Sequence, residues 1–257
     1  MIPTIIHLGP IPINSFGLMV ALALLVGIER LAISFRRFGL PEQLAERYVL
    51  WSGFLGLVGA RLWFIGDHWS EVRGELVAAL LASAGFVFYG GFITAWIVVL
   101  VLLRRDGIAP RRFFDAFGPA LALGYAVGRL GCQLSGDGDY GAQTTSFWGM
   151  SYSSGVIPTP PGVLVYPTPF FESTIAIAIA VVLGRVEVSR SPFWQKPFAR
   201  MGLCLLLLSV ERFFIEFLRI NPRVAGGVLS EAQVIALVLT AIGGALLLRP
   251  TAAQSAA

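Results

Sequence analysis

Stretches of about 20 apolar residues, enough for a helix to cross the ~30 Å hydrocarbon core of a bilayer, recur along the whole chain. The composition agrees with this pattern, because 56% of the 257 residues are hydrophobic and only 13% are charged. An ordinary soluble chain carries about 25% charged residues. A disordered chain, a nucleic-acid-binding tail and a water-soluble enzyme are therefore excluded. We predict an all-α, polytopic membrane protein.

Seven apolar segments can be marked out, and they predict about seven transmembrane helices. The segments are 16–36, 46–66, 77–103, 113–134, 168–186, 198–219 and 229–248. The third is long enough for one tilted helix, or for a short entry segment followed by a span. Residues 135–167 are dense in Gly, Ser, Thr, Pro and aromatics, which favours turns, with room for short strands, over helix. The sequence thus predicts a single transmembrane domain over residues 1–257 with a small irregular insert at 135–167.

The Lys and Arg residues of the loops predict the orientation of the chain. Residues 1–15 and 135–167 contain none, and the second connection contains only Arg73. The first, third and fifth connections and the C-terminal tail are basic, so basic and poor loops alternate. This places the N-terminus and the insert outside and the C-terminus in the cytoplasm. The formal net charge of +4 then reflects topology rather than an anionic partner. No basic region precedes the first span, so we expect no cleaved signal peptide.

Several charged residues lie inside the apolar segments, where a charge at the bilayer centre costs about 2.5–3.5 kcal/mol. They are Arg61, Arg129, Glu172, Glu211, Arg212 and Glu216. Such residues usually face a polar cavity and mark function. The alternative is that Arg and Glu pair only to lock helices together. Arginines from several helices would suit a phosphate, which guanidinium binds in a bidentate fork, and a phospholipid headgroup is always at hand.

Helical spacing groups some of these residues. Arg212, Glu216 and Arg219 fall on one face of a helix, from which Glu211 points away. The residues Arg129, Cys132 and Gln133 share a face of another helix in the same way. Small residues let membrane helices approach closely. That role is predicted for Gly124, Gly128 and Gly131.

Other chemistries fit the sequence less well. A Ser–His hydrolase at 134–136 needs a histidine base in the membrane, whereas His7 and His68 lie outside the predicted spans. Cys132 and Cys204 lie within apolar segments, so we expect no disulfide, and no cluster has the ligand spacing of a metal site. The dominance of Arg disfavours a cation channel. A secondary transporter stays open, because intramembrane charges also build transport sites.

The motifs together resemble the prolipoprotein diacylglyceryl transferase family. The pieces are GRLGCQLSGDGDYG at 128–141, LGPIPINSFGLMVA at 8–21, GARLWF at 59–64, FVFYGGF at 86–92, YPTPFFE at 166–172 and RFFIEFLR at 212–219. They follow the family order over nearly the whole chain. The resemblance implies a seven-helix, N-out protein of the bacterial inner membrane.

The resemblance also implies an activity and partners. The family transfers diacylglyceryl from phosphatidylglycerol, or a similar anionic phospholipid, to the thiol of a lipobox cysteine in a preprolipoprotein signal peptide, forming a thioether. It implies no cofactor and no metal, and no nucleic acid as partner. A non-catalytic lipid- or lipoprotein-binding homologue in the membrane is the alternative, followed by a transporter.

Carried over by position, the resemblance gives roles to residues of this chain. Arg129 and Arg212 would hold the lipid phosphate, with Glu216 and Asp137 orienting them or contacting the headgroup, and Gly141 would close the signature turn. One extra residue in this turn makes Asp139 a competitor of Asp137 for the acidic position. Further predicted site residues are Arg61, Tyr89, Cys132, Gln133, Glu172 and Arg219.

The chain departs from the family pattern at several polar positions. Phe16, Tyr89 and Cys132 stand where the family has Tyr, His and Asn, and the family's His-Pro-x-Gln stretch reads Tyr166 and Pro169. We expect Tyr89 to act as a hydrogen-bonding group near the phosphate. We expect the Cys132 side chain to be buried and to fill space as a small apolar group. The alternative is that Cys132 is a reactive thiolate whose pKa is lowered by Arg129.

Overall fold

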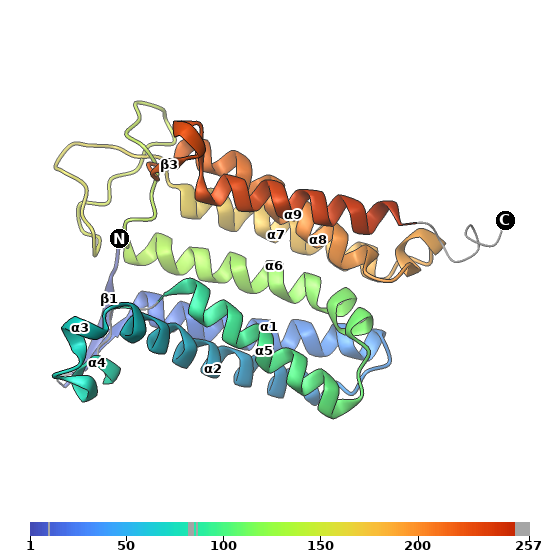
Figure 1. Cartoon of the computed structure of the whole chain (residues 1–257). Helices are drawn as coiled ribbons and strands as arrows, with labels where there is room; N and C mark the ends of the chain where they lie inside the picture. Colours follow the sequence, from blue (N-terminus) through green and yellow to red (C-terminus); the bar gives the residue numbers. More distant parts are fainter. Residues whose placement is uncertain (10, 82–84, 86, 250–257) are drawn as a thin grey trace.

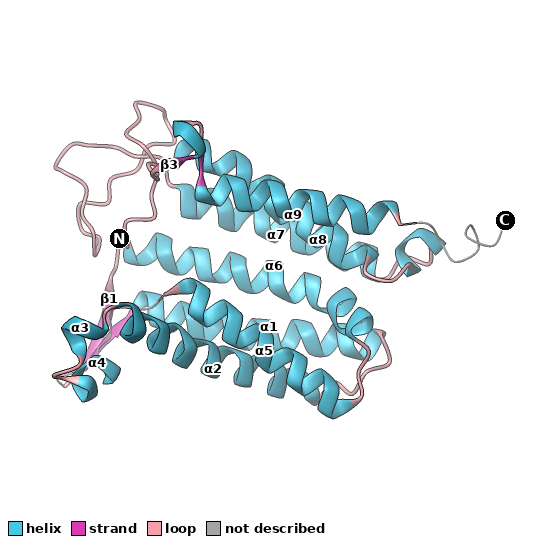
Figure 2. Cartoon of the chain, viewed as in Figure 1, coloured by secondary structure: helices cyan, strands magenta, loops and turns pink. Residues whose placement is uncertain are grey.

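A computed structural model describes residues 1–9, 11–81, 85 and 87–249. Within them the fold is mostly helical, and seven helices have 17 residues or more (Figures 1 and 2). These are α1 (Ser15–Arg37), α2 (Leu44–Asp67), α5 (Phe88–Asp106), α6 (Pro110–Ser135), α7 (Thr168–Glu187), α8 (Ala199–Ile215) and α9 (Glu231–Leu248). The shorter elements are α3 (Trp69–Val72), α4 (Leu76–Leu81), η1 (Pro192–Gln195), η2 (Glu216–Leu218) and η3 (Ala225–Gly227).

Local sequence signals set the ends of several helices. Gly107 follows α5 and Gly136 follows α6 in the left-handed conformation, with φ of 65° and 61°, where glycine is favoured. Pro110 lies in the first turn of α6, where its missing N–H is not needed. At α9, Ser230 accepts from the backbone N–H of Gln233, and the Gln233 side chain accepts from Ser230 N–H, which forms a capping box.

Helix α6 is the central element of the bundle. It lies between a group formed by α1, α2 and α5 and a group formed by α7, α8 and α9 (Figure 1), and it packs against α1, α7 and α8. At the end opposite to the N-terminus, Phe35, Tyr48 and Phe113 form a buried aromatic cluster, with ring centroids of Tyr48 and Phe113 4.9 Å apart. The central helix therefore carries contacts to both halves of the chain.

Close helix packing relies on one of the predicted glycines and on others that were not predicted. A Cβ on Gly131 would lie 3.0 Å from Met19 Cβ, which confirms its predicted role. The prediction is wrong for Gly128, because nothing lies within 4 Å of a Cβ there. Instead, Gly59 of α2 faces Gly90 of α5, where a Cβ on either would lie less than 3 Å from the partner's carbonyl oxygen. These two helices thus touch through their backbones.

Two small sheets, which the sequence analysis did not predict, accompany the mostly helical fold. Strands β1 (Thr4–Leu8) and β2 (Ile11–Asn14) form an antiparallel hairpin, and β3 (Arg223–Val224) pairs with β4 (Leu229–Ser230). The β-branched residues of 4–13 favour strands, and counting apolar runs overlooked them. The hairpin is tied to the end of α6 by a hydrogen bond of 2.8 Å from Ile2 N–H to Leu134 O.

The third apolar segment, predicted at 77–103, does not form one helix. Helix α4 ends at Leu81, α5 begins at Phe88, and Gly85 and Val87 between them are not helical. Residues 82–84 of the segment, and Phe86 of the motif FVFYGGF, lie outside the described residues. The alternative of a short entry segment followed by a long helix is the one that the structure confirms.

The 135–167 insert is irregular, as predicted. The described chain forms only isolated bridges there, from Val165 to Gln143 and to Met150. Its anchor is Tyr152, whose buried side chain donates a hydrogen bond of 2.6 Å to Gln133 Oε1 on α6. The insert is thereby held against the end of the central helix.

Four of the described helices, α1, α2, α7 and α9, are long and apolar enough to cross a membrane. Large apolar side chains such as Leu25, Phe54 and Val238 are exposed on their outer faces, which suits contact with lipid rather than water. The chain is therefore a polytopic membrane protein. The number of seven spans stays a prediction.

Candidate active site

Glu172, in the first turns of α7, is the centre of a buried group of charges between α6, α7 and α8. Its side chain has an exposed fraction of 0%. Oε1 accepts hydrogen bonds from Tyr125 Oη at 3.0 Å and from Arg212 Nη1 at 2.7 Å. Oε2 accepts from Arg129 Nη2, and Arg219 Nη1 lies 3.8 Å away. One carboxylate thus joins arginines from two different helices.

Asp139, in the insert just after α6, is the second carboxylate of this group. It accepts hydrogen bonds from Arg129 Nη1 and, at 2.8 Å, from Arg219 Nη2. Its backbone carbonyl accepts from Arg219 Nη1 at 2.9 Å and from Thr168 Oγ1 at 2.7 Å. Burial alone would raise the pKa of Asp139, but the two guanidinium groups outweigh burial and hold its pKa at about 2. Asp139 is therefore an ionised partner of both arginines.

Glu216 is the third carboxylate, and it follows directly after α8. Its Oε2 lies 2.9 Å from Arg212 Nη2 and 3.8 Å from Arg219 Nε. Asn221 Nδ2 donates to its Oε1 at 2.6 Å. The predicted common face of Arg212, Glu216 and Arg219 is confirmed, although the last of these turns is the 3₁₀ turn η2 rather than α-helix.

We call these six residues the arginine–carboxylate cluster: Arg129, Arg212, Arg219, Asp139, Glu172 and Glu216. Three positive charges face three negative ones, so the cluster is neutral as a whole. Breaking a buried ion pair by removing one partner costs about 3–5 kcal/mol, and this fixes the positions of the guanidinium groups. Among the three arginines, Arg212 has the most accessible side chain, 28% exposed against 12% for Arg129 and 9% for Arg219, and Asp139 is more exposed still, at 37%. Arg212 is therefore the arginine of the cluster that is most open to a ligand.

Asp137 and Asp139, the two acidic candidates within residues 128–141, differ in their hydrogen-bond partners. Asp139 pairs with the arginines, whereas Asp137 Oδ1 accepts the Asp139 backbone N–H at 3.3 Å. Burial raises the pKa of Asp137. Asp139 is therefore the aspartate that pairs with the arginines, Asp137 supports the turn, and which of the two holds the acidic position of the family stays a prediction.

Of the predicted common face of Arg129, Cys132 and Gln133, the structure shows contact between the first two residues. Arg129 Nη1 lies 3.5 Å from the sulfur of the buried Cys132. Gln133 turns toward the insert, where it accepts from Tyr152 and contacts the sulfur of Met150 at 3.7 Å. Cys132 thus borders the cluster, and Gln133 fixes the insert above it.

Gly141 marks a close approach of the insert to η2. A Cβ at this position would clash with the carbonyl oxygen of Leu218. Its N–H donates to Tyr166 O at 2.8 Å, and the next residue, Ala142, donates its N–H to Leu218 O at 2.7 Å. Only a residue without a side chain fits here, and the contact holds Asp139 near the end of α8.

Arg61 and Tyr89 make their described hydrogen bonds with other groups. Arg61 on α2 donates to the backbone carbonyl of Gly85 at 2.6 Å and to that of Ala79. Tyr89 on α5 donates its hydroxyl to Glu231 at the start of α9. The predicted contact of Tyr89 with the lipid phosphate and the predicted role of Arg61 in the site remain predictions.

Sequence reasoning missed several residues of the site. Tyr125, Thr168 and Asn221 each donate to a carboxylate or carbonyl of the cluster. Tyr125 lies one turn before Arg129 on α6, and this spacing could have revealed it.

Glu211, one of the predicted intramembrane charges, is buried, and neither of its carboxylate oxygens has a hydrogen-bond partner among the described residues.

Cys132, Asp137 and Asp139 could each offer a ligand atom to a metal ion, and these atoms lie within 4.8 Å of one another. The surroundings are unsuitable for a cation. Asp139 is already bonded to two arginines, and Arg129 lies against the Cys132 sulfur. The donor set fits an anion-binding site with arginine donors better than a metal centre.

The known proteins most useful for comparison agree on one family. The family model described as prolipoprotein diacylglyceryl transferase matches residues 3–249. The chain is 29% identical over 240 residues to phosphatidylglycerol–prolipoprotein diacylglyceryl transferase 2 of Clostridium perfringens, with 91% of this chain and 90% of that protein covered.

Two further relatives carry the name phosphatidylglycerol–prolipoprotein diacylglyceryl transferase. The protein from Staphylococcus saprophyticus is 26% identical over 249 residues, which covers 94% of this chain and 86% of the relative. The protein from Lysinibacillus sphaericus is 26% identical over 268 residues, with 96% and 92% covered. Because the family model matches almost the full length of this chain, the chain belongs to the prolipoprotein diacylglyceryl transferase family of membrane enzymes.

Proposed function

We propose that this chain transfers diacylglyceryl from phosphatidylglycerol to the lipobox cysteine thiol of a prolipoprotein, and that the arginine–carboxylate cluster holds the lipid phosphate. The observation that carries the proposal is the convergence of Arg129 and Arg212, from α6 and α8, on the buried carboxylate of Glu172. The names of the relatives support the donor and the acceptor.

The reaction needs an anion-stabilising site more than a reactive side chain. The thiol sulfur forms a bond to an sp³ carbon of the glycerol backbone, the bond from that carbon to the phosphate oxygen breaks, and glycerol phosphate leaves with the electron pair. The thiol proton leaves with a base or with solvent. Arg212 and Arg129 neutralise the charge that grows on the leaving phosphate, where preorganised donors are most effective.

The remaining predicted residues support these two arginines. Glu172 and Glu216 hold the guanidinium planes, and Asp139 with Arg219 closes the cluster toward the insert. We assign Tyr89 to a contact with the bound lipid, together with Arg61. Cys132 and Gln133 shape the wall beside Arg129.

We further propose seven spans in a bacterial inner membrane, with the N-terminus and the insert in the periplasm and the C-terminus in the cytoplasm. The arginine-rich connections after α1, α5 and α7 lie at the end of the bundle opposite to the N-terminus, which supports this orientation (Figure 1). The cluster, near the insert, then lies toward the periplasmic side.

Complementation of a strain depleted of its own diacylglyceryl transferase tests the function. We expect growth and a thioether-linked diacylglyceryl group on lipoprotein, detected by mass spectrometry. An Arg129→Gln variant, inserted at the wild-type level, should support neither. Stable expression of the wild-type chain without any lipoprotein modification would reject the proposal in favour of a non-catalytic lipid- or lipoprotein-binding homologue.

A further inference from the structure

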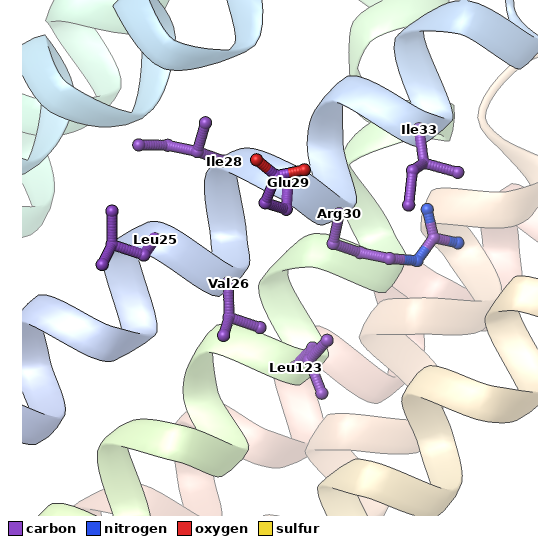
Figure 3. Close-up of a pocket in the computed structure, with 7 residues that line it drawn as sticks. All are labelled: Leu25, Val26, Ile28, Glu29, Arg30, Ile33 and Leu123. Atoms are coloured by element: carbon purple, nitrogen blue, oxygen red, sulfur yellow. The ribbon is translucent and has the colours of Figure 1, made fainter.

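A groove lies on the flank of α1 and α6, in the half of the bundle away from the N-terminus. Its volume is about 360 Å³. The lining is mostly apolar, and Leu123 of α6 lies beside Val26 of α1 (Figure 3). The residues that line it are Leu25, Val26, Ile28, Glu29, Arg30, Ile33 and Leu123. We call it the Glu29 groove.

The two charged residues of the groove differ in their partners. Arg30 donates to Ser34 Oγ at 2.6 Å and pairs with Glu187 of α7 at 2.6 Å. Glu29 is exposed, and it makes no hydrogen bond or ion pair with any described residue. The groove therefore carries one carboxylate whose charge is not matched within the described chain.

The position of Glu29 makes this charge costly in a membrane. It lies eight residues before the end of α1 at Arg37, which is about 12 Å along the helix axis. A charge in the hydrocarbon region costs about 2.5–3.5 kcal/mol on insertion scales. An occupant that suits the groove has an apolar body and a cation.

We propose that the Glu29 groove binds the basic n-region and the first apolar residues of the substrate's signal peptide. The inference rests on the proposed function and its orientation, which place this end of α1 toward the cytoplasm. A signal peptide has a positively charged n-region, followed by an apolar h-region of about 7–15 residues before its processing site. Glu29 pairs with the n-region cation while the groove wall covers the start of the h-region.

The separation of the groove and the arginine–carboxylate cluster along the helix axes fits this peptide. Helices α1 and α6 run antiparallel, because Gly131 faces Met19 while Gly124 faces Ala23. Arg129 lies six residues beyond Leu123 on α6, about 9 Å along the axis, and Glu29 lies three residues beyond Val26 on α1, about 4.5 Å in the other direction. The total of about 14 Å corresponds to about nine helical residues, within the range of an h-region.

Symmetric contact with a second copy of the chain suits the groove less well. In a twofold contact the same patch faces itself, so two Glu29 carboxylates would come together in the membrane, while Arg30 of the groove is already paired with Glu187. Such like charges are destabilising. Charge complementarity therefore favours a cationic peptide.

The test compares two peptides and three variants of the full-length protein. A lipobox peptide with lysines in its n-region, and the same peptide with glutamines there, are measured for affinity in nanodiscs without phosphatidylglycerol. KM and kcat are then measured in phosphatidylglycerol liposomes. The variants are Glu29→Gln, the charge-conserving Glu29→Asp, and the control Glu46→Gln, which alters another exposed glutamate, on α2.

We expect Glu29→Gln to weaken binding of the lysine peptide, and to raise its KM, by about fivefold, the effect of an ion pair of about 1 kcal/mol. Its kcat, and the glutamine peptide, should be unaffected. Glu29→Asp should stay within about twofold of wild type, and Glu46→Gln should match it. Equal effects of Glu29→Gln on both peptides, no effect on either, or a changed oligomeric state without a changed peptide preference would each overturn the inference.

Measuring peptide affinity separately from lipid transfer distinguishes a failure of this inference from a failure of the proposed function. If the wild-type chain binds the lysine peptide in a Glu29-dependent way but transfers no lipid, the groove assignment stands and the transferase proposal fails. If transfer proceeds but Glu29→Gln leaves the peptide preference unchanged, the groove assignment fails alone.

Discussion

Replacing Glu172 by glutamine should separate the chemistry of the site from its stability. Both Glu172 and Glu187 lie on α7 and both side chains are 0% exposed, and Glu172 forms ion pairs with three arginines and Glu187 with two. Only Glu172 belongs to the arginine–carboxylate cluster. Glu187→Gln is therefore a matched control for the loss of a buried carboxylate.

The expected cost in stability follows from the partners that remain. Losing one partner of a buried pair costs about 3–5 kcal/mol. In Glu172→Gln, Arg129 keeps Asp139 and Arg212 keeps Glu216, so we expect about 3 kcal/mol, or an apparent Tm about 6–12 °C lower. In Glu187→Gln, Arg37 is 43% exposed and is solvated when released, so we expect about 2 kcal/mol.

Activity should respond very differently. A shift of a catalytic group by about 1 Å can cost about 100-fold in rate, and the glutamine amide would turn an N–H donor toward the arginines that Glu172 orients. We expect kcat/KM for diacylglyceryl transfer to fall at least about 100-fold in Glu172→Gln and less than about threefold in Glu187→Gln. Thermal unfolding by intrinsic fluorescence and transfer rates well below both apparent Tm values give the comparison. Equal losses of activity in the two variants would refute the assignment of Glu172 to the site.

Four further outcomes are expected. Arg212→Gln should abolish transfer while the protein still inserts, and Arg212→Lys should recover only part of the transfer activity, since lysine lacks the bidentate fork. Normal binding of anionic lipid vesicles by the Gln variant would mean that the arginine only holds helices together. A periplasm-active reporter should be active when fused after Ser154 and inactive after Arg105, and the reverse would overturn the orientation. Cys132→Ser and Cys132→Ala should both keep activity, with no lipid adduct on the wild-type thiol by mass spectrometry; loss of activity in both, with a diacylglyceryl adduct, would make this cysteine the nucleophile. The pKa of Asp139 is lowered to about 2, so its stabilising effect should be complete above the ordinary pKa of about 3.9 and be lost as pH falls through 2. The apparent Tm of the wild type and of Asp139→Asn, measured over a pH series, should therefore converge only at the acid end.

Sequence patterns predicted the helical architecture and much of the cluster because both depend on local spacing. Apolar runs locate helices, and the shared face of Arg212, Glu216 and Arg219 follows from 3.6 residues per turn. The central position of Glu172 depends on how α7 packs against α6 and α8, and no local rule contains that. Which of Asp137 and Asp139 pairs with the arginines was decided in the same way, by the reach of two arginines across the fold. The β1–β2 hairpin was missed because its short strands precede the first apolar run.

Position in the chain also governs when each charge of the cluster receives its partners during synthesis. In the proposed topology, Arg129 enters the membrane with α6 and Asp139 follows within about ten residues, whereas Glu172 appears only after the whole insert has been made. At 5–20 residues per second, Glu172 emerges about 2–9 s after Arg129, and Arg212 about as long again after that. Until then, an arginine in the bilayer carries a cost of about 2.5–3.5 kcal/mol. In the proposed orientation, the insert is exported while α6 is only partly compensated, so the speed of translocation of residues 135–167 should influence how much chain reaches its folded state.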